Sequence, residues 1–411
     1  MGNKYKYSAE QIKVVSGFEA VRKRPGMYVG ATDAKGLHQM LNEVIDNSVE
    51  EAIAGFCNKI EVILRPDNVV TVIGNGRGLP VEIDSQTGKS SLEIILTVLS
   101  AWSLFKKYGR RINSNSRGTD FAPINFLSEW LEITVWQNNK IYYQRYEQGK
   151  PVNLLSEEAN NNNHNSGTSI TFKADQEIFK KYKFNPTILQ LRLQELAYLN
   201  ANLQLTFKDL RTNSEKITRY HYPQGMRDYL SEMNRNRSLI NEQAIHIREQ
   251  QDNILVEVAL QWNADDEEKL CLKDFHGVVM HHRWRSNYSE RDQQSKIYDA
   301  IHLLSFVNQL YTLNGGTHVA GVKQGIIQAI TAILPQYSNR DRQSNLTWET
   351  LSFGLTGIIS VMLPQPEYGG AAKWELISPD VTDIVSRLVE EACIKYFSEN
   401  LPVLQKILKS Q

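Results

Sequence analysis

The chain has 411 residues, which is enough for two domains of ordinary size. Its 46 basic residues balance 46 acidic ones, and 41% of its residues are hydrophobic, which indicates a globular protein rather than a strongly basic nucleic-acid binder. The sequence has no long apolar run, no apolar signal segment and only three widely spaced cysteines, so we expect a protein of the bacterial cytoplasm without a membrane span, a disulfide framework or a Cys-based zinc site.

Helical spacing of apolar residues and alternation of apolar with polar residues predict the first elements. Residues 8–34 predict a short helix followed by a basic turn. Residues 36–55 predict one long helix, because their apolar residues recur at helical spacing and Gly55 follows at the position of a C-terminal cap. A β-hairpin is expected next, with strands at 60–64 and 69–73 and a turn at Asp67-Asn68.

A glycine-rich loop at residues 74–80 ends that hairpin, and the pattern then alternates between helices and strands. The segment 106–120 is polar and irregular. The remaining predicted elements of this half are a helix at 91–105, strands at 131–136 and 169–172, and a helix at 186–199.

A change of domain is predicted near Tyr222-Pro223-Gln224-Gly225. Helices and strands alternate on both sides of this break, which indicates an α+β fold in two layered units. The elements predicted beyond the break are strands at 254–262 and 356–363 and helices at 318–333 and 379–397.

Three long motifs in both halves carry a family resemblance. They are IKVVSGFEAVRKRPGMYVGATDAKGLHQM continuing into NEVIDNSVEEAIAG, then VEVALQWN at 256–263, and NGGTHVAGVKQGI at 314–326. In this order they resemble the B subunits of the bacterial type IIA DNA topoisomerases, DNA gyrase and topoisomerase IV. The resemblance covers about residues 7–400, and the family's metal-binding DNA-cleavage domain would follow them.

The resemblance implies the architecture. Residues 1–222 would form a GHKL (Bergerat) ATPase α/β sandwich, and residues 223–400 a transducer domain similar to ribosomal protein S5, with residues 401–411 as a C-terminal tail. In the family, ATP and Mg²⁺ clamp two such units into a dimer that closes a gate around DNA. The implied partners are therefore a second copy, gyrase or topoisomerase subunits, and DNA, but not a membrane.

The implied catalytic residues lie on the long predicted helix. Glu43 and Asn47 are four residues apart, so their side chains share one face. By resemblance, Glu43 polarises the attacking water and Asn47 binds the magnesium that bridges the phosphates. Gln39 stands where the family usually has a His that supports the Glu, and Glu51 and Arg77 match a pair with a mainly structural role.

The base end of the pocket departs from the family pattern. The family loop begins with an Asp that accepts the adenine amino hydrogen, and Gly74 stands there, whereas Gly76, Gly78 and Thr168 are present. Losing a hydrogen bond of this kind costs about 1.5–3 kcal/mol, or roughly ten- to a hundred-fold in affinity. Asn75 is a candidate substitute acceptor, although it occupies the alternate position on the loop.

The phosphate end departs further. The family's lid carries glycines whose backbone N–H groups wrap the phosphates, and only Gly118 survives of that box. Asp120 would bring a negative charge towards the triphosphate, and Arg111 or Arg117 would partly replace a lost Lys. The alternative, which we favour, is that 106–120 has become an ordinary surface loop.

Two further residues match distant parts of the family site. Lys373, in Ala371-Ala372-Lys373, matches a transducer Lys that touches the γ-phosphate, although the preceding Gln is lost. Tyr7 matches a Tyr of the N-terminal arm that reaches the partner's nucleotide.

An insertion around 264–300 contains a cluster of His, Arg and Trp residues. It fits a metal cluster poorly because acidic or Cys partners at ligand spacing are missing. Its basic and aromatic composition is compatible with contact to nucleic acid. A decorated surface loop is the interpretation that we favour.

The leading hypothesis is a gyrase-B-like ATPase/transducer paralogue, a pseudoenzyme with little or no ATPase activity, that acts in DNA topology or partner binding. The alternative is a functional ATP-dependent topoisomerase subunit with a remodelled lid. A third hypothesis is a histidine-kinase-like or chaperone-like Bergerat protein. The GGTH motif of the transducer argues against it, and no phosphoacceptor-His helix pair precedes the pocket.

Overall fold

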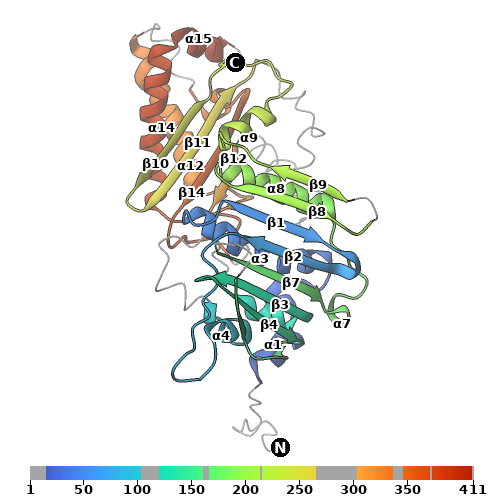
Figure 1. The fold of residues 1–411 in the computed structure, drawn as a ribbon. Helices are drawn as coiled ribbons and strands as arrows, with labels where there is room; N and C mark the ends of the chain where they lie inside the picture. Colours follow the sequence, from blue (N-terminus) through green and yellow to red (C-terminus); the bar gives the residue numbers. More distant parts are fainter. Residues whose placement is uncertain are drawn as a thin grey trace, which may run out of the picture.

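The computed structural model describes residues 15–102, 120–160, 166–212, 215–264, 303–336, 346–370 and 373–409. Within these residues the strands form two sheets, one above the other along the molecule, and helices pack against both (Figure 1). The predicted α+β fold class is confirmed.

The first sheet is mixed, because β1 and β8 run parallel and the other neighbouring strands run antiparallel. From one edge to the other its strands are β5 (Lys150–Pro151), β4 (Lys140–Glu147), β3 (Ser128–Gln137), β7 (Gly167–Ala174), β2 (Val69–Gly74), β1 (Lys59–Leu64), β8 (Gln204–Asp209) and β9 (Lys216–Tyr220), and β6 (Ser156–Ala159) also pairs with β4.

The long helix α3 (Ala34–Ile53) packs against β1 and β2 of the first sheet. The Asp33 carboxylate caps α3 by accepting hydrogen bonds from the backbone N–H groups of Lys35 (2.7 Å) and Gly36 (3.4 Å). Its buried apolar stripe belongs to the same core as the inner residues of β1, β2, β3 and β7. The other helices are α1 (Gly17–Lys23), α2 (Gly26–Val29), α4 (Ser91–Thr97), α6 (Phe121–Phe126), α7 (Gln176–Phe179) and α8 (Pro186–Leu199).

The sequence predicted most of these elements but not the length of α4. The hairpin turn is confirmed, since Asp67 and Asn68 both have positive φ angles (58° and 60°). The helix predicted at 91–105 is confirmed only for its first part, α4, and residues 103–105 lie outside the described ones. Helix α4 ends at Thr97 because Val98 is extended, and the backbone N–H of Ser100 then donates to the Asp120 carboxylate at 2.6 Å.

The second sheet has the strand order β10 (Ile245–Gln251), β11 (Ile254–Trp262), β14 (Leu355–Met362), β12 (Leu303–Val307) and β13 (Leu310–Tyr311). Helices α12 (Thr317–Ile333) and α14 (Asp380–Glu399) cover one face. They approach closely because a Cβ at Gly321 or Gly325 would lie 2.7 Å or 2.5 Å from a backbone oxygen of α14. The remaining helices are α9 (Met226–Met233), α13 (Trp348–Leu351) and α15 (Leu401–Lys409).

A third apolar cluster, separate from the cores of the two halves, joins them. It packs the end of α8 and helix α9 against the other face of the second sheet, through residues that include Tyr198, Tyr229, Leu304 and Phe306. The rings of Tyr198 and Tyr229 stack with centroids 4.5 Å apart. β11 and β14 are therefore buried on both faces, which explains why they read as almost continuous apolar runs.

A buried arginine crosses the same junction. The side chain of Arg192, on α8, is 1% exposed. Its guanidinium donates to Asp46 of α3 at 3.1 Å, to Glu195 at 2.9 Å and to the backbone oxygen of Gln309, in the β12–β13 turn, at 3.3 Å. One side chain thus links α3, α8 and the second sheet.

The predicted domain limits stay a prediction. β9 ends at Tyr220 and β10 begins at Ile245, so the predicted change near residue 222 falls between the two sheets. Across the described ranges, no helix has the length and apolarity that a bilayer span requires.

We expect the substitution Arg192→Leu to lower the unfolding temperature strongly, as followed by circular dichroism. It would leave the Asp46 and Glu195 carboxylates buried without their cation, and removing one partner of a buried ion pair costs about 3–5 kcal/mol. The control is Arg235→Leu, which breaks an exposed pair with Glu232 worth less than about 1 kcal/mol. Equal unfolding temperatures for the two variants would contradict this role of Arg192.

Candidate functional site

Helix α3 presents three of the predicted residues on one face. The Gln39 side-chain amide donates to the Glu43 carboxylate at 2.5 Å. Asn47 lies one turn further along, is 6% exposed, and its Nδ2 has no hydrogen-bond partner within the described part of the chain. Gln39 therefore holds Glu43 in place, as the imidazole of the family pattern would, but with an amide that does not titrate.

A small cavity lies where α3 meets the end of β2. The volume that the centre of a water molecule can occupy inside it is about 10 Å³, which is enough for one water. Register pairing places Thr168 on β7 directly opposite Gly74 on β2, which brings residues far apart in sequence to one wall. The lining residues are Asn47, Ser48, Glu51, Gly74, Gly76, Gly78, Leu79 and Thr168. The predicted residues Asn47, Gly76, Gly78 and Thr168 are thus brought together.

The loop after β2 is fixed by an ion pair and by close packing. The Arg77 guanidinium meets the Glu51 carboxylate at 3.0 and 3.1 Å, and the Arg77 backbone N–H donates to the same carboxylate at 3.1 Å. The predicted Glu51–Arg77 pair is therefore present. Gly78 has a φ of +87°, and a Cβ there would lie 2.9 Å from Val135, so this position requires glycine.

The side chain of Asn75 points away from the cavity. Its Oδ1 accepts hydrogen bonds from the backbone N–H groups of Asn58 (3.0 Å) and Lys59 (2.9 Å), and its Nδ2 donates to the Asn58 side chain at 2.7 Å. These contacts all serve the start of β1, and Asn75 is not among the residues that line the cavity.

Strand β7 contributes the polar side chain of Thr168 to the cavity wall. Its hydroxyl oxygen accepts a hydrogen bond from the Leu79 backbone N–H at 3.1 Å. The hydroxyl proton therefore stays available for an acceptor in the cavity.

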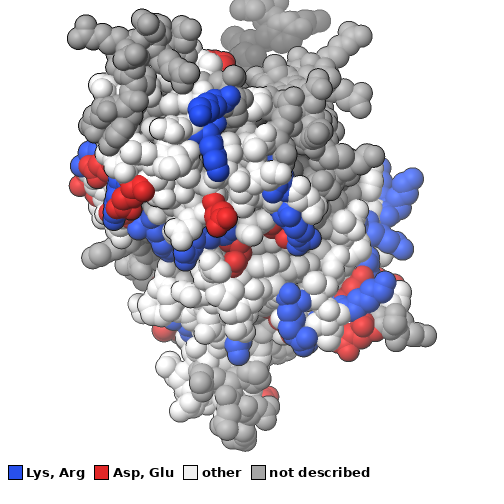
Figure 2. Space-filling view, turned by 90° about the horizontal axis from the view of Figure 1, so that it is seen from above, with Lys and Arg blue, Asp and Glu red and all other residues white. Residues whose placement is uncertain are grey.

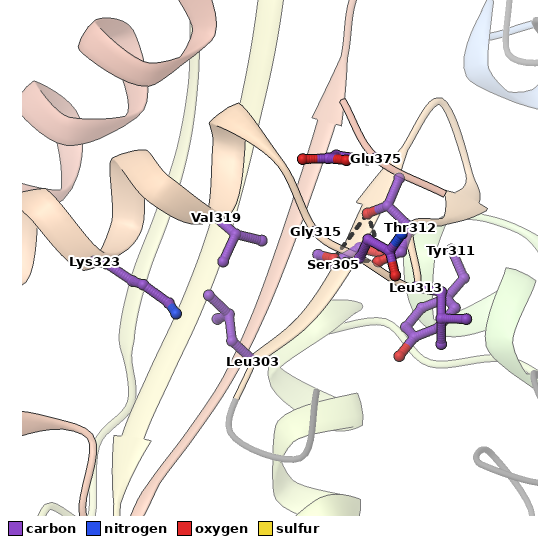
Figure 3. Close-up of a pocket in the computed structure, with 10 residues that line it drawn as sticks. Leu303, Ser305, Tyr311, Thr312, Leu313, Gly315, Val319, Lys323 and Glu375 are labelled. Atoms are coloured by element: carbon purple, nitrogen blue, oxygen red, sulfur yellow. Dashed lines mark hydrogen bonds between the residues drawn. The ribbon is translucent and has the colours of Figure 1, made fainter. Parts of the chain in front are cut away.

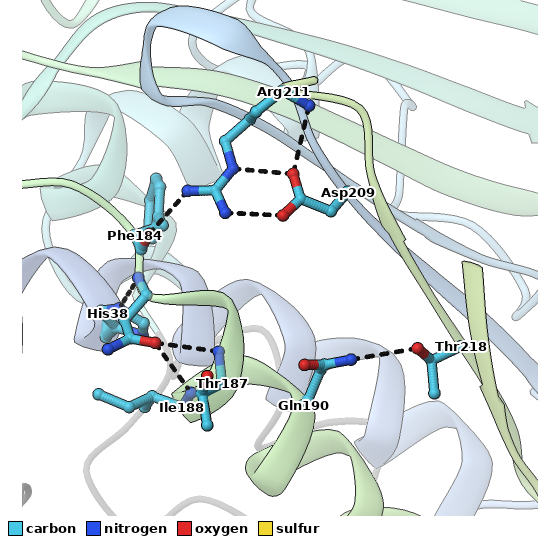
Figure 4. A network of polar contacts seen from close by, with 9 residues as sticks. His38, Phe184, Thr187, Ile188, Gln190, Asp209, Arg211 and Thr218 are labelled. Atoms are coloured by element: carbon cyan, nitrogen blue, oxygen red, sulfur yellow. Dashed lines mark hydrogen bonds and ion pairs between the residues drawn. The ribbon is translucent and has the colours of Figure 1, made fainter. Parts of the chain in front are cut away.

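The first turns of α3 are held by a polar network around the start of α8 (Figure 4). Burial lowers the pKa of His38 to about 4, so its imidazole is neutral and Nε2 accepts the Asn185 backbone N–H at 2.8 Å. The Asn185 side chain caps α8, and Arg211 joins Asp209 on β8 to the backbone oxygen of Phe184. The helix that carries Glu43 and Asn47 is thus anchored near its N-terminal end.

Lys373 lies in the second half and is not among the residues that line the small cavity. Its ammonium is 5.8 Å from the centre of the Tyr368 ring, and its φ is +59°. Another cavity, of about 280 Å³, lies near this segment and is lined by Lys323 and Glu375 among others (Figure 3). Ser305 and Thr312 in its wall share a hydrogen bond of 2.8 Å.

Several predictions fall outside the described residues. They concern Tyr7, Gly118, most of the lid segment 106–120 and nearly all of the insertion around 264–300. Asp120 is described, and its carboxylate caps α6 through the Ala122 backbone N–H, a structural use that the sequence did not indicate. Within the described ranges, no group of three or more His, Cys, Asp or Glu side chains is placed to hold a metal ion.

Ser48 is a lining residue that was not among the predicted site residues. It sits beside Asn47 in the motif, but nothing in the motif shows that it faces Gly74. A Cβ built on Gly74 would lie 2.7 Å from the Ser48 Oγ, so the two positions share one space. Only the packing of α3 against β2 reveals this relation.

Comparison with known proteins places these features in a family context. A family model described as histidine kinase-, DNA gyrase B- and HSP90-like ATPase matches residues 32–178, which include α3, the glycine loop and Thr168. A model described as DNA gyrase B matches residues 293–411. The two matches fall on the two halves of the chain.

Individual proteins agree with these family matches. The B subunit of DNA gyrase from Synechocystis sp. is 38% identical over 405 residues, covering 98% of this chain and 34% of that protein. The 43K ATPase domain of Thermus thermophilus gyrase B, solved in complex with an aminocoumarin, has a TM-score of 0.76 at 27% identity and covers 96% of this chain and 94% of that one.

The ATP-binding domain of topoisomerase IV from Francisella tularensis, at 24% identity, shows the same fold with a TM-score of 0.74 and covers 97% of this chain and 96% of that one. The chain spans roughly one third to three fifths of the length of the curated relatives that it matches. A GHKL ATPase fold followed by a transducer is thereby established.

Asn75→Ala tests whether Asn75 serves the fold rather than a ligand. We expect a stability loss of about 1–2 kcal/mol, because three local hydrogen bonds disappear, and no change in affinity for an ATP analogue measured by calorimetry. Asn58→Ala removes only the side-chain partner and should destabilise less. A roughly ten-fold loss of nucleotide affinity in Asn75→Ala would show instead that Asn75 contacts the base.

Proposed function

Because the chain belongs to the family of DNA gyrase and topoisomerase IV B subunits, we propose that it is an ATPase/transducer module with a degenerate nucleotide site. It binds ATP weakly, hydrolyses it near the background rate, and acts as a non-hydrolysing paralogue in DNA topology or partner binding. The observation that carries this proposal is Gly74, where the loop that meets Thr168 offers no carboxylate.

The base end of the site supports weak binding. In the family pattern a carboxylate accepts the adenine amino hydrogen, and here position 74 has no side chain. Asn75 is committed to Asn58 and Lys59, so it does not take over. Without that bond we expect affinity to fall roughly ten- to a hundred-fold.

The residues of α3 still fit magnesium and a water. Asn47 has a buried amide nitrogen without a partner among the described residues, and an amide in this position suits a phosphate oxygen or, when turned, the ion itself. When bound, magnesium would neutralise phosphate charge. Glu43, which accepts a hydrogen bond from Gln39, would orient a water next to Asn47.

The sequence of the lid supports a loss of coupling between nucleotide binding and dimerisation of the chain. Segment 106–120 retains Gly118 but not the other glycines of the family box or its Lys. A ligand shifts an equilibrium only by its differential affinity for the two states, so ATP retains few contacts with which to favour a closed dimer. Lys373, the proposed γ-phosphate contact, and Tyr7, the proposed arm contact, are the remaining candidates.

The proposed partners follow from the family, namely a second copy of the chain and gyrase or topoisomerase subunits. DNA is a further proposed partner, but Figure 2 gives it little support on the face that it shows. There, Lys and Arg side chains are interspersed with Asp and Glu. A cytoplasmic location stays a prediction from the sequence.

A working ATP-dependent subunit with a remodelled lid is the second candidate. The observation in its favour is the 2.5 Å contact between Gln39 and Glu43, which keeps the catalytic carboxylate of the family pattern in a defined position. This candidate requires that residues outside the described ranges rebuild the contacts to the phosphates.

Steady-state ATPase assays distinguish the two candidates. We expect turnover near the background of the uncatalysed reaction, and Glu43→Gln should leave that rate unchanged. The control variant is Glu61→Gln, on the first sheet outside the small cavity, which should behave like the unmodified chain. Turnover comparable to that of a gyrase B fragment, abolished by Glu43→Gln and not by Glu61→Gln, would establish the working subunit instead.

A further inference from the structure

A groove of about 620 Å³ crosses the first sheet on the face turned away from α3. Lys59 and Glu61 of β1 line it, and they alternate with Ile60 and Val62, which belong to the core shared with α3. The groove reaches from β3 to β9, which are separated by five interstrand spacings, or roughly 24 Å. It is therefore long enough for about seven residues of an extended chain.

The part of the groove over β1, β8 and β9 is basic. Lys59 and Arg219 are exposed, and neither side chain makes an ion pair with another described residue. The register of the three strands sets these two cations two strands apart on the same face of the sheet. The Glu61 carboxylate, which also lines the groove, is already paired with Lys208 at 2.8 Å. Both cations thus remain available to an anionic group.

The part over β2, β7 and β3 has an apolar floor. The half-buried side chains of Ile73 and Trp136 line it. Trp136 is paired with Gly167, where a Cβ would lie 2.5 Å from the Gly74 backbone oxygen, so no side chain fills the space beside the indole. Among the described lining residues, no Lys or Arg lies at this end. An apolar side chain of a ligand therefore fits there better than a charged one.

The separation of charge from apolar surface decides which class of ligand fits. A nucleic acid strand carries a phosphate on every nucleotide, so it would place charge along the whole groove, including the Trp136 end that offers no cation. A protein segment can carry carboxylates at one end and apolar side chains at the other. The groove matches the second distribution.

We propose that this groove binds an extended acidic segment of a protein partner. The carboxylates of the segment pair with Lys59 and Arg219, and an apolar side chain packs against Trp136. The inference goes beyond the proposed function, because the groove lies on the other face of the sheet from Glu43 and Asn47 and requires no nucleotide. It gives the partner a stated chemistry.

The test is calorimetric titration of the full chain, without nucleotide, with the synthetic peptide acetyl-Leu-Phe-Gly-Ser-Asp-Glu-Asp. We expect a dissociation constant on the order of 0.1 mM at low salt, and weaker binding as salt rises because the ion pairs are exposed. A peptide of the same composition with its acidic and apolar residues alternating should bind about three-fold more weakly or worse. No binding at millimolar concentration, or equal binding of the two peptides, would overturn the inference.

Variants locate the binding in the groove. Lys59→Gln and Arg219→Gln should each weaken the peptide about three- to five-fold, because each removes one exposed charge pair. Trp136→Ala should weaken it about ten-fold through the lost apolar contact. The control is Lys216→Gln, which removes an exposed cation of β9 that does not line the groove and should change nothing. If Trp136→Ala unfolds, as judged by circular dichroism, the two charge variants still decide, and unchanged affinity in both would refute the site.

An oligothymidylate of eight nucleotides, titrated under the same conditions, examines the other class of extended anion. We expect it to bind about ten-fold more weakly than the peptide, because the indole end offers its phosphates no cation. Tighter binding than the peptide, weakened by both Lys59→Gln and Arg219→Gln, would assign the groove to single-stranded nucleic acid and overturn the proposal. Because these titrations contain no nucleoside triphosphate, their outcome is independent of the ATPase result.

Discussion

The buried guanidinium of Arg192 is the contact on which the arrangement of the two halves depends. It donates hydrogen bonds to a carboxylate on α3, to a carboxylate on its own helix α8, and to a backbone oxygen in the β12–β13 turn of the second sheet. Two buried carboxylates without a cation would be unstable, so the three elements are obliged to meet at this residue. Asp46, the α3 partner, lies between Glu43 and Asn47 in sequence, so the helix that carries the predicted catalytic residues is tied directly to the second sheet.

The frame of the nucleotide site survives independently of its chemistry. The Glu51–Arg77 pair, the positive φ of Gly78 and the pairing of Gly74 with Thr168 all serve the packing of the fold, and none of them needs a ligand. Under the proposed function, the changes are confined to groups that would meet the ligand, notably the residue at position 74. A fold can therefore persist unaltered while its affinity for nucleotide declines, because function depends on the site and not on the fold.

Sequence patterns predicted the elements well where one periodicity dominates. Helix α8 and strand β11 occupy the predicted ranges, and α3 differs from its prediction by two residues at each end. The helix predicted at 91–105 is interrupted after Thr97, where Val98 is extended and the Ser100 N–H donates to Asp120, which is distant in sequence. Local patterns contain no information about such a contact.

The site shows the same contrast between what sequence motifs predict and what depends on packing. The structure brings Asn47, Gly76, Gly78 and Thr168, four residues predicted from the motif resemblance, into one cavity, while their binding of a nucleotide stays a prediction. The resemblance gave no indication that Asn75 turns towards β1, that Ser48 shares its space with Gly74, or that Arg192 joins the halves, because each of these depends on which elements pack together.

Sedimentation velocity, with and without a non-hydrolysable ATP analogue and magnesium, tests most directly whether nucleotide still drives this module. If the site has lost its contacts to the phosphates and the base of the nucleotide, the distribution of monomer and dimer at a given protein concentration should be the same in both conditions. A clear shift from monomer to dimer on adding the analogue would contradict the account, because it would show that the nucleotide clamp still closes.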